Sequence, residues 1–217
     1  GNIPEKVLIE IGSARKAYLV DVNHWSMPLN EHGLDISVQD RLPSVTHHVL
    51  TSPSGVLASC RTIYNPEINE IDSLPFLATN ELNGETLNDG APSVNRILKE
   101  RINQDPSYKV SLASNSWATI ERLVPSSQAV SLANYDRDTS IILAQAFTGA
   151  IAVSAAAYLR SKGVRHVVIQ ADDRYRKHYQ TTLGLSDDAV VCTKIHNLYD
   201  GTPDPCHTMV LDLTEAE

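Results

Sequence analysis

Apolar and polar residues follow two different rhythms along this chain, which indicates a mixture of helices and strands. Residues 13–25 carry apolar positions at the spacing of an amphipathic helix, and a polar loop over 26–44 follows them. Residues 46–51 and 55–64 are β-rich runs separated by proline, serine and glycine, a composition typical of an antiparallel hairpin. The chain is therefore predicted to begin with a helix, a loop and a hairpin.

The second half of the chain predicts a strand, a long helix and then further strands around a shorter helix. Strand 117–124 runs into a proline-serine loop, and a nearly wholly apolar helix follows, with Asp138 or Thr139 as N-cap and Gly163 as C-cap. A helix that is apolar nearly all round is expected to be buried on most sides. The remaining pattern predicts a strand, a helix and two strands, at residues 164–171, 173–184, 189–195 and 206–213, with turn-rich residues at 196–205.

The segment between the hairpin and strand 117–124 predicts two helices, at residues 74–84 and 91–104, joined by turns. The resulting order is helix, hairpin, helices and β-α-β-α-β-β. This order predicts one α/β (α+β) domain over residues 1–217, in which helices flank a mixed sheet.

Composition and charge exclude several classes of protein. The 217 residues are 42% hydrophobic, which is ample for a core, and the net charge of -8 argues against a general nucleic-acid binder. No apolar run approaches the roughly 20 residues needed to cross a bilayer, and a signal peptide is not evident. A cytoplasmic protein without a membrane span is expected. Cys60, Cys192 and Cys206 show no metal-ligand spacing, so no metal site is predicted.

The block from strand 117–124 through the long helix, Gly163 and Gly184 resembles the acyl-carrier binding core of the GNAT acyltransferase superfamily. Within that superfamily, the chain is most similar to the acyl-homoserine-lactone (autoinducer) synthases and the long-chain N-acyl amino acid synthases. The supporting features are an N-terminal helix followed by Trp25 and an acidic loop, the strand "GVLASCRTI" with Arg61, the segment "DSLPFLA", and "TIERL".

This resemblance implies a GNAT-like three-layer fold with a mixed, mostly antiparallel sheet. It also implies an N-acyltransferase that moves an acyl group from an acyl-CoA or acyl-carrier-protein thioester to a primary amine. The phosphopantetheine of the donor is then a co-substrate, and no tightly bound cofactor is expected. The acyl chain would lie between the sheet and the helices of residues 75–104.

A phosphopantetheine arm presents amides and a phosphate, so a strand edge with free N–H groups beside a helix N-terminus suits it. The same amides can stabilise the oxyanion that forms when an amine attacks the thioester, because they are fixed before the charge develops. The predicted donor contacts are the strand-edge amides of Leu123 and Val124 and the phosphate-side loop residues Ser126 and Ser127.

The resemblance also implies roles in the reaction. Asp35, Asp40 and Glu121 are candidates to remove the proton of the attacking amine, directly or through water. Arg122 could organise the acidic loop or bind the carboxylate of the acceptor. Tyr179 is a candidate acid for the leaving thiolate, since it lies next to the position where many acetyltransferases carry a tyrosine.

The predicted substrate contacts are Trp25, Arg61 and Thr119. Thr119 occupies the position of the autoinducer synthases' strand glutamate, whereas Glu121 falls on the opposite face of a regular strand from its neighbour Arg122.

Several alternatives remain open at this point. Arg61 and Arg122 are also consistent with structural ion pairs. Only one of His47 and His48 can face a site, because adjacent strand residues point to opposite faces. The acceptor is either S-adenosylmethionine or an amino acid or other amine. Two other functions fit the same fold, namely an acetyl-CoA-dependent acetyltransferase and a non-catalytic sensor of an acyl thioester or small ligand.

Overall fold

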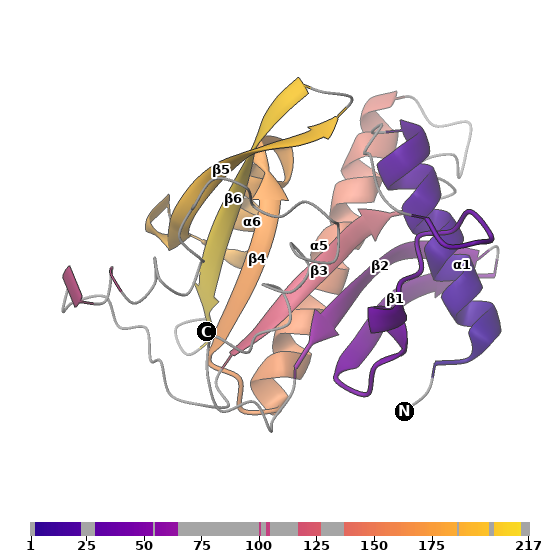
Figure 1. Ribbon diagram of the computed structural model, residues 1–217, viewed down its shortest axis with the longest axis horizontal. Helices are drawn as coiled ribbons and strands as arrows, with labels where there is room; N and C mark the ends of the chain where they lie inside the picture. Colours follow the sequence, from indigo (N-terminus) through magenta and orange to yellow (C-terminus); the bar gives the residue numbers. More distant parts are fainter. Residues whose placement is uncertain are drawn as a thin grey trace.

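The structure is a computed structural model that describes residues 3–22, 29–53, 55–64, 100, 103–104, 117–126, 137–185, 187–199 and 202–213. The described strands form a six-stranded sheet in the order β1-β2-β3-β4-β6-β5 (Figure 1). Neighbouring strands are antiparallel except for the parallel pair β3 and β4, so the predicted mixed, mostly antiparallel sheet is confirmed. The strands are β1 Val45–Ser52, β2 Gly55–Ile63, β3 Trp117–Pro125, β4 His166–Asp172, β5 Val190–Tyr199 and β6 Thr202–Asp212.

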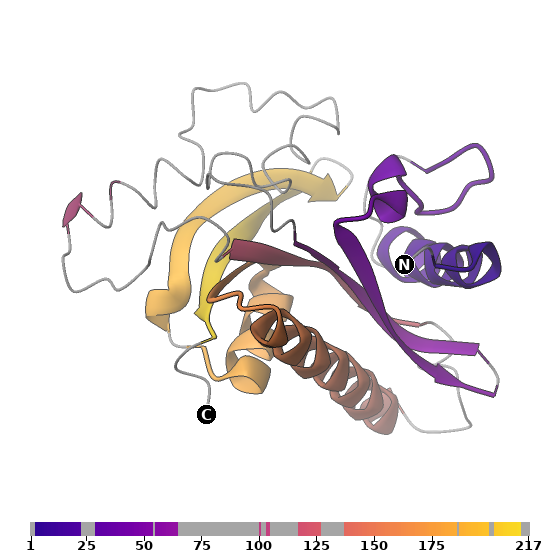
Figure 2. The ribbon, with the colours of Figure 1, turned by 90° about the horizontal axis from the view of Figure 1, so that it is seen from below.

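Helices cover both faces of this sheet, which gives the three layers that the sequence predicts. Figure 2 shows α1 on one face and α5 with α6 on the other. The described helices are α1 Glu5–Lys16, its π-helical continuation η1 Ala17–Val22, the 3-10 turn η2 Val38–Arg41, α5 Arg137–Ser161, α6 Asp173–Leu183 and the 3-10 turn η4 Asp187–Ala189.

The hydrophobic core lies between the sheet and the layer formed by α5 and α6. Every second side chain along parts of β2, β3, β4 and β6 points toward this layer and is apolar, as expected for strands with one face on a core. Its most buried members include Ala58, Cys60, Ala118, Ile120, Ala152, Ala155, Leu159, Val167, Ile169 and Met209.

The parallel ladder between β3 and β4 is short. It ends at the pair Ile120 and Ile169, although β3 continues to Pro125 and β4 to Asp172. Figure 1 shows the two strands side by side at their amino ends and far apart at their carboxyl ends. We call this opening beyond Ile120 and Ile169 the β3–β4 divergence.

The edge of β3 that faces β2 carries a β-bulge just beyond Ile120, where the ladder with β4 ends. Ser59 of β2 faces Val124, but Arg61 faces Glu121, so one extra residue is inserted into β3 between these pairs. Arg122 lies within the bulge and has a φ of 54°, a conformation uncommon for a residue other than glycine. The bulge and the β3–β4 divergence therefore occur at one point of one strand.

The first helix begins at Glu5, earlier than the sequence prediction of residue 13. The reason is a buried stripe at the i, i+3, i+7 spacing of a helix, formed by Leu8, Ile11 and Arg15. Two members of this stripe, Leu8 and Ile11, lie before residue 13, outside the segment whose apolar spacing predicted the helix. Strands β5 and β6 also extend into residues 196–205, which the sequence predicted to be turn-rich.

Helix α5 differs from its prediction in its start and in its burial. It begins at Arg137, so Asp138 and Thr139 lie within it rather than capping it. It is not buried on most sides, because Ile142 is 63% exposed and Val153 is 50% exposed. Its predicted end at Gly163 is confirmed, and a φ of 82° there suits a glycine after a helix.

The expectation that no apolar run has the length of a membrane span is wrong for α5. Residues Asp138–Ser161 are long and apolar enough by length and composition, with 33% of the most apolar window buried. One such helix is weak evidence for a span, because the core helix of a soluble protein passes the same test. Helix α5 packs along β1, β2 and β3, as a core helix does.

The antiparallel hairpin of β1 and β2 and the helix that ends before Gly184 are also confirmed. The predicted helices at residues 74–84 and 91–104 lie almost wholly outside the described residues, and so does the proposed place for the acyl chain.

Candidate functional site

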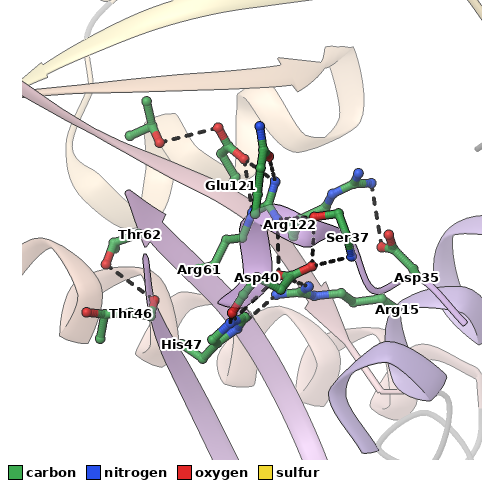
Figure 3. A network of polar contacts seen from close by, with 12 residues as sticks. Arg15, Asp35, Ser37, Asp40, Thr46, His47, Arg61, Thr62, Glu121 and Arg122 are labelled. Atoms are coloured by element: carbon green, nitrogen blue, oxygen red, sulfur yellow. Dashed lines mark hydrogen bonds and ion pairs between the residues drawn. The ribbon is translucent and has the colours of Figure 1, made fainter. Parts of the chain in front are cut away.

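A network of buried polar side chains lies between α1, η2 and the strands β1, β2 and β3 (Figure 3). Charged groups are almost never fully buried unless they are paired, so this network needs a physical account. We call it the Asp40 network; its members are Arg15, Ser37, Gln39, Asp40, His47, Arg61 and Glu121.

Arg61 of β2 is 1% exposed and uses its whole guanidinium group within the protein. Its Nε and Nη2 donate to Oε2 of Glu121 at 3.1 and 2.7 Å. Its Nη1 donates to Ser37 Oγ at 3.2 Å and to Asp40 Oδ1 at 3.0 Å, and Nη2 also donates to Gln39 Oε1 at 3.0 Å. A guanidinium has five N–H donors. All five are engaged, so Arg61 forms the structural ion pairs left open by the sequence.

Asp40 is the anion shared by two buried arginines. Its Oδ1 accepts from Arg15 Nη1 at 2.8 Å and from Arg61, while Oδ2 accepts from the amide and hydroxyl of Ser37 at 2.8 and 3.0 Å. The contacts to Ser37 form a capping box on η2. Burial alone would raise the pKa of Asp40, but the charges of Arg15 and Arg61 outweigh it and hold the pKa well below its ordinary value. Such a carboxylate is a weak base, so its position favours an anchoring role.

His47 of β1 completes the network on the side of α1. Its Nε2 donates to the carbonyl oxygen of Asp40 at 2.9 Å, and its Nδ1 accepts from Arg15 Nη2 at 3.3 Å. A carbonyl can only accept and a guanidinium can only donate, so the partners select the neutral imidazole with its proton on Nε2. His48 points to the other face, toward Thr62, as the alternation of strand residues predicts.

The bulge in β3 brings Glu121 and Arg122 to the same side of the sheet. Glu121 reaches Arg61, and Nη1 of Arg122 lies 3.6 Å from Oδ2 of Asp35. The expectation that Glu121 and Arg122 face opposite ways is therefore wrong, because the alternation of a regular strand is interrupted at Arg122. Their side chains remain 18% and 21% exposed, whereas that of Asp40 is 1% exposed. These two groups are the part of the site that a ligand can reach.

The other predicted residues are placed as follows. Thr119 is buried on the same side as Glu121, and its hydroxyl donates to Glu121 Oε1 at 3.3 Å. Leu123 and Val124 lie in the carboxyl-terminal part of β3, along the β3–β4 divergence. The amide of Ser126 donates to the carbonyl of Leu57 at 2.8 Å. This backbone hydrogen bond already uses the amide, so it does not donate to a phosphate in this arrangement. Trp25 and Ser127 lie outside the described residues.

Tyr179 lies apart from the Asp40 network. It belongs to the hydrophobic core between α6 and the sheet, where it is 4% exposed. Burial raises the pKa of its hydroxyl, which keeps the phenol protonated. Its role as an acid remains a prediction.

Sequence reasoning missed four members of the network, namely Arg15, Ser37, Gln39 and the site-facing role of His47. Arg15 could have been found from its i+7 spacing to Leu8 on the stripe that faces the sheet. Gln39 and His47 carry no comparable signal, since their partners lie far away in the sequence. Within the described residues, no group of three histidine, cysteine or acidic side chains could hold a metal ion.

Gly12 lets the loop with Asp35 approach α1. A Cβ atom at Gly12 would lie 2.4 Å from Cγ1 of Ile36, and the Gly12 carbonyl accepts from the amide of Asp35 at 3.4 Å. We expect Gly12→Ala to destabilise the protein by about 1–3 kcal/mol through overpacking, more than the roughly 1 kcal/mol that alanine gains in a helix. Thermal unfolding measures this, with Gly149→Ala of α5, where the nearest contact is 3.1 Å, as the control. An equally stable Gly12→Ala protein would show that the close approach is not required.

The environment of His47 predicts a pH dependence of stability. Burial is the largest cause that lowers the pKa of His47 below its ordinary value of 6.5, and the charge of Arg15 lowers it further. The unfolded state then binds more protons, so the stabilisation is complete above pH 6.5 and is lost as pH falls through the lowered folded pKa. We expect His47→Gln, which keeps an N–H donor, to flatten the dependence of unfolding free energy between pH 7 and 5.

The control for this titration is His32→Gln, because His32 is exposed on the surface. Burial also lowers the pKa of His48, His166 and His178, so part of the slope will remain in the His47 variant. An unchanged slope in His47→Gln would contradict the placement of a neutral imidazole in the network.

Comparison with known proteins identifies this architecture. No protein-family model matches the chain, and no curated protein matches its sequence. Solved structures match over nearly its whole length. The acyl-homoserine-lactone (AHL) synthase LasI is 13% identical and has a TM-score of 0.60, with 97% of this chain and 85% of LasI covered.

Two further structures extend the match. FeeM, an N-acyl amino acid synthase from uncultured soil microbes, is 11% identical with a TM-score of 0.56, and the match covers 100% of this chain and 96% of FeeM. BjaI, a CoA-dependent acyl-homoserine lactone synthase solved with SAM and isopentyl-CoA, is 10% identical with a TM-score of 0.53, covering 96% of this chain and 77% of BjaI.

The chain therefore has the fold of the acyl-homoserine-lactone synthases and the N-acyl amino acid synthases. The fold that the sequence resemblance implied is confirmed, and at these identities the fold is what the proteins share.

Proposed function

We propose that this protein is an N-acyltransferase that moves an acyl group from a phosphopantetheine thioester to a primary amine. The observation that carries the proposal is the bulge in β3. It presents Glu121 and Arg122 to a ligand at the level where β3 separates from β4, in a fold shared with N-acyl synthases. An anionic and a cationic group thus stand beside a strand edge that can hold an amide-bearing arm.

The donor would bind along the β3–β4 divergence. Beyond Ile120, the β4-facing edge of β3 pairs with no strand among the described residues, so its backbone groups can bond to the amides of the arm. The carboxyl end of β3 and the amino end of α5 lie at the same end of the molecule (Figure 1), and a helix N-terminus favours a phosphate. Acyl-CoA and an acyl carrier protein present the same arm, and both are proposed donors.

The acceptor would bind through both charges of the bulge. The carboxylate of Glu121 can hold the ammonium group of the acceptor and take its proton, directly or through water. Arg122, anchored by Asp35, can bind a carboxylate of the same acceptor. We therefore infer an acceptor with adjacent amino and carboxylate groups, such as an amino acid or S-adenosylmethionine, which carries the same two groups.

The reaction then follows from these positions. The free amine attacks the thioester carbonyl, and backbone N–H groups of the β3 edge stabilise the oxyanion. The carbon–sulfur bond breaks as the amide forms, and the thiolate leaves with the pantetheine arm and takes up a proton. With an amino acid the product would be an N-acyl amino acid. With S-adenosylmethionine the acceptor's carboxylate would also attack the carbon beside its sulfonium, closing the lactone ring and releasing methylthioadenosine, so the product would be of the acyl-homoserine-lactone type used in quorum sensing. We propose that this occurs in the cytoplasm, where these substrates are made.

Release of free thiol from purified protein tests the proposal. Acyl-CoA and acyl-carrier-protein donors of several chain lengths are each combined with S-adenosylmethionine, with amino acids and with simple amines. We expect thiol release that requires an acceptor carrying both amino and carboxylate groups. If no donor and acceptor pair releases thiol above the background without acceptor, the protein is not an acyltransferase, and donor binding without turnover would favour a sensor.

A further inference from the structure

Two tyrosines from opposite layers of the molecule meet near the β3–β4 divergence. Tyr18 belongs to η1, which continues α1 and packs against β3. Tyr175 belongs to α6, which starts directly after the last residue of β4 and packs on the other face. The hydroxyl of Tyr175 donates to the hydroxyl of Tyr18, and the two rings pack edge to face with centroids 6.4 Å apart.

Paired strands separate the two faces of a sheet, so side chains from opposite layers meet only where the sheet is open or has ended. The ladder between β3 and β4 ends at Ile120 and Ile169, while the elements carrying the two tyrosines lie against β3 and directly after β4. The Tyr18–Tyr175 contact therefore bridges the two sides of the divergence near its wide end.

We propose that Tyr18 and Tyr175 hold the pantetheine arm of the donor within the β3–β4 divergence and so position the thioester for attack. This inference rests on the proposed function, because it concerns the donor of the same reaction. The edges of β3 and β4 can bind an extended arm from its two sides. They do not prevent the arm from leaving the divergence in the direction perpendicular to the sheet. A contact that bridges the opening confines the arm, and phenol hydroxyls can both donate to and accept from its amides.

The pair would act on the donor and not on the acceptor. Arg122 and Glu121, the groups proposed to hold the acceptor, lie at the bulge on the β2-facing edge of β3, whereas the tyrosines bridge the opening on its β4-facing side. Removing one hydroxyl should therefore weaken donor binding without changing acceptor binding. Because one hydroxyl–hydroxyl contact needs both partners, the two single changes and the double change should have similar effects.

Steady-state kinetics and calorimetry on the whole chain test this, with Tyr18→Phe, Tyr175→Phe and the double variant. We expect each to raise KM for acyl-CoA by about threefold to tenfold, to weaken binding of CoA alone by a similar factor, and to leave KM for the acceptor unchanged. The control is Tyr64→Phe, which also removes one phenol hydrogen bond, from Tyr64 to the carbonyl of Lys162, on a different part of the sheet.

The outcomes separate the two proposals. If wild-type protein binds no CoA and transfers no acyl group, the proposed function fails. If wild type is active but the tyrosine variants bind CoA as wild type does, or if their effects simply add, the positioning role is overturned. A loss of thermal stability with unchanged donor KM would likewise show that the contact serves only the fold.

Discussion

Asp40→Asn is expected to lower the free energy of unfolding by about 3–5 kcal/mol, the cost of removing one partner from a buried ion pair. The substitution keeps the shape of the side chain but removes the charge that Arg15 and Arg61 share. Both guanidinium groups are almost fully buried, so water cannot replace the lost anion. Arg15 then has no carboxylate within ion-pair distance among the described residues. Urea denaturation measures the change.

The matched control for this prediction is Asp21→Asn. Asp21 also pairs with a cation, Lys16 at 2.7 Å, but both side chains are substantially exposed. Exposed pairs contribute little to stability, so this variant should unfold close to wild type. Equal stability of the Asp40 variant and wild type would mean that the ion pairs of Asp40 with Arg15 and Arg61 do not stabilise the packing of α1 and η2 on the sheet.

Glu121→Gln is expected to lower kcat by about 100-fold or more, because general acid–base groups typically contribute factors of 10² to 10⁴. Glutamine can still accept from Arg61, so the geometry of β2 and β3 is kept while the negative charge is lost. KM for the acceptor should rise as well, since the ammonium group loses its counter-ion.

Glu5→Gln is the control for the Glu121 variant. Glu5 also pairs with an arginine, Arg41 at 2.6 Å, but on the surface and away from β3. We expect this variant to retain full activity. A folded Glu121→Gln protein with wild-type kcat and KM would remove Glu121 from the mechanism and would leave the bulge without a base.

Much of the fold follows from local patterns in the sequence. The "SPSG" turn between two β-rich runs predicts the hairpin of β1 and β2, and glycines at 163 and 184 mark the ends of α5 and α6. Local pattern failed where a polar residue takes a buried place. The buried stripe of α1 ends in Arg15, which does not fit an apolar pattern, and its apolar members Leu8 and Ile11 precede the predicted start at residue 13.

The site could be predicted only in part, because its geometry depends on contacts between distant segments. Asp35, Arg61 and Arg122 were identified as candidates, but the division between buried and reachable groups was not visible in the sequence. That division depends on the bulge at Arg122, whose positive φ is uncommon for arginine and has no local signal. A regular strand would have sent Glu121 and Arg122 to opposite faces.

Mass spectrometry of small molecules from cells that overproduce this chain tests whether it makes an N-acyl product at the bulge of β3. Cells producing the Arg122→Ala variant at the same level are the comparison. We expect a new N-acyl compound in the first extract that is missing from the second, and its mass would identify both the acyl chain and the acceptor. The same compound at equal abundance in both extracts would contradict the role of Arg122, and no new compound in either extract would contradict the proposed N-acyltransferase activity.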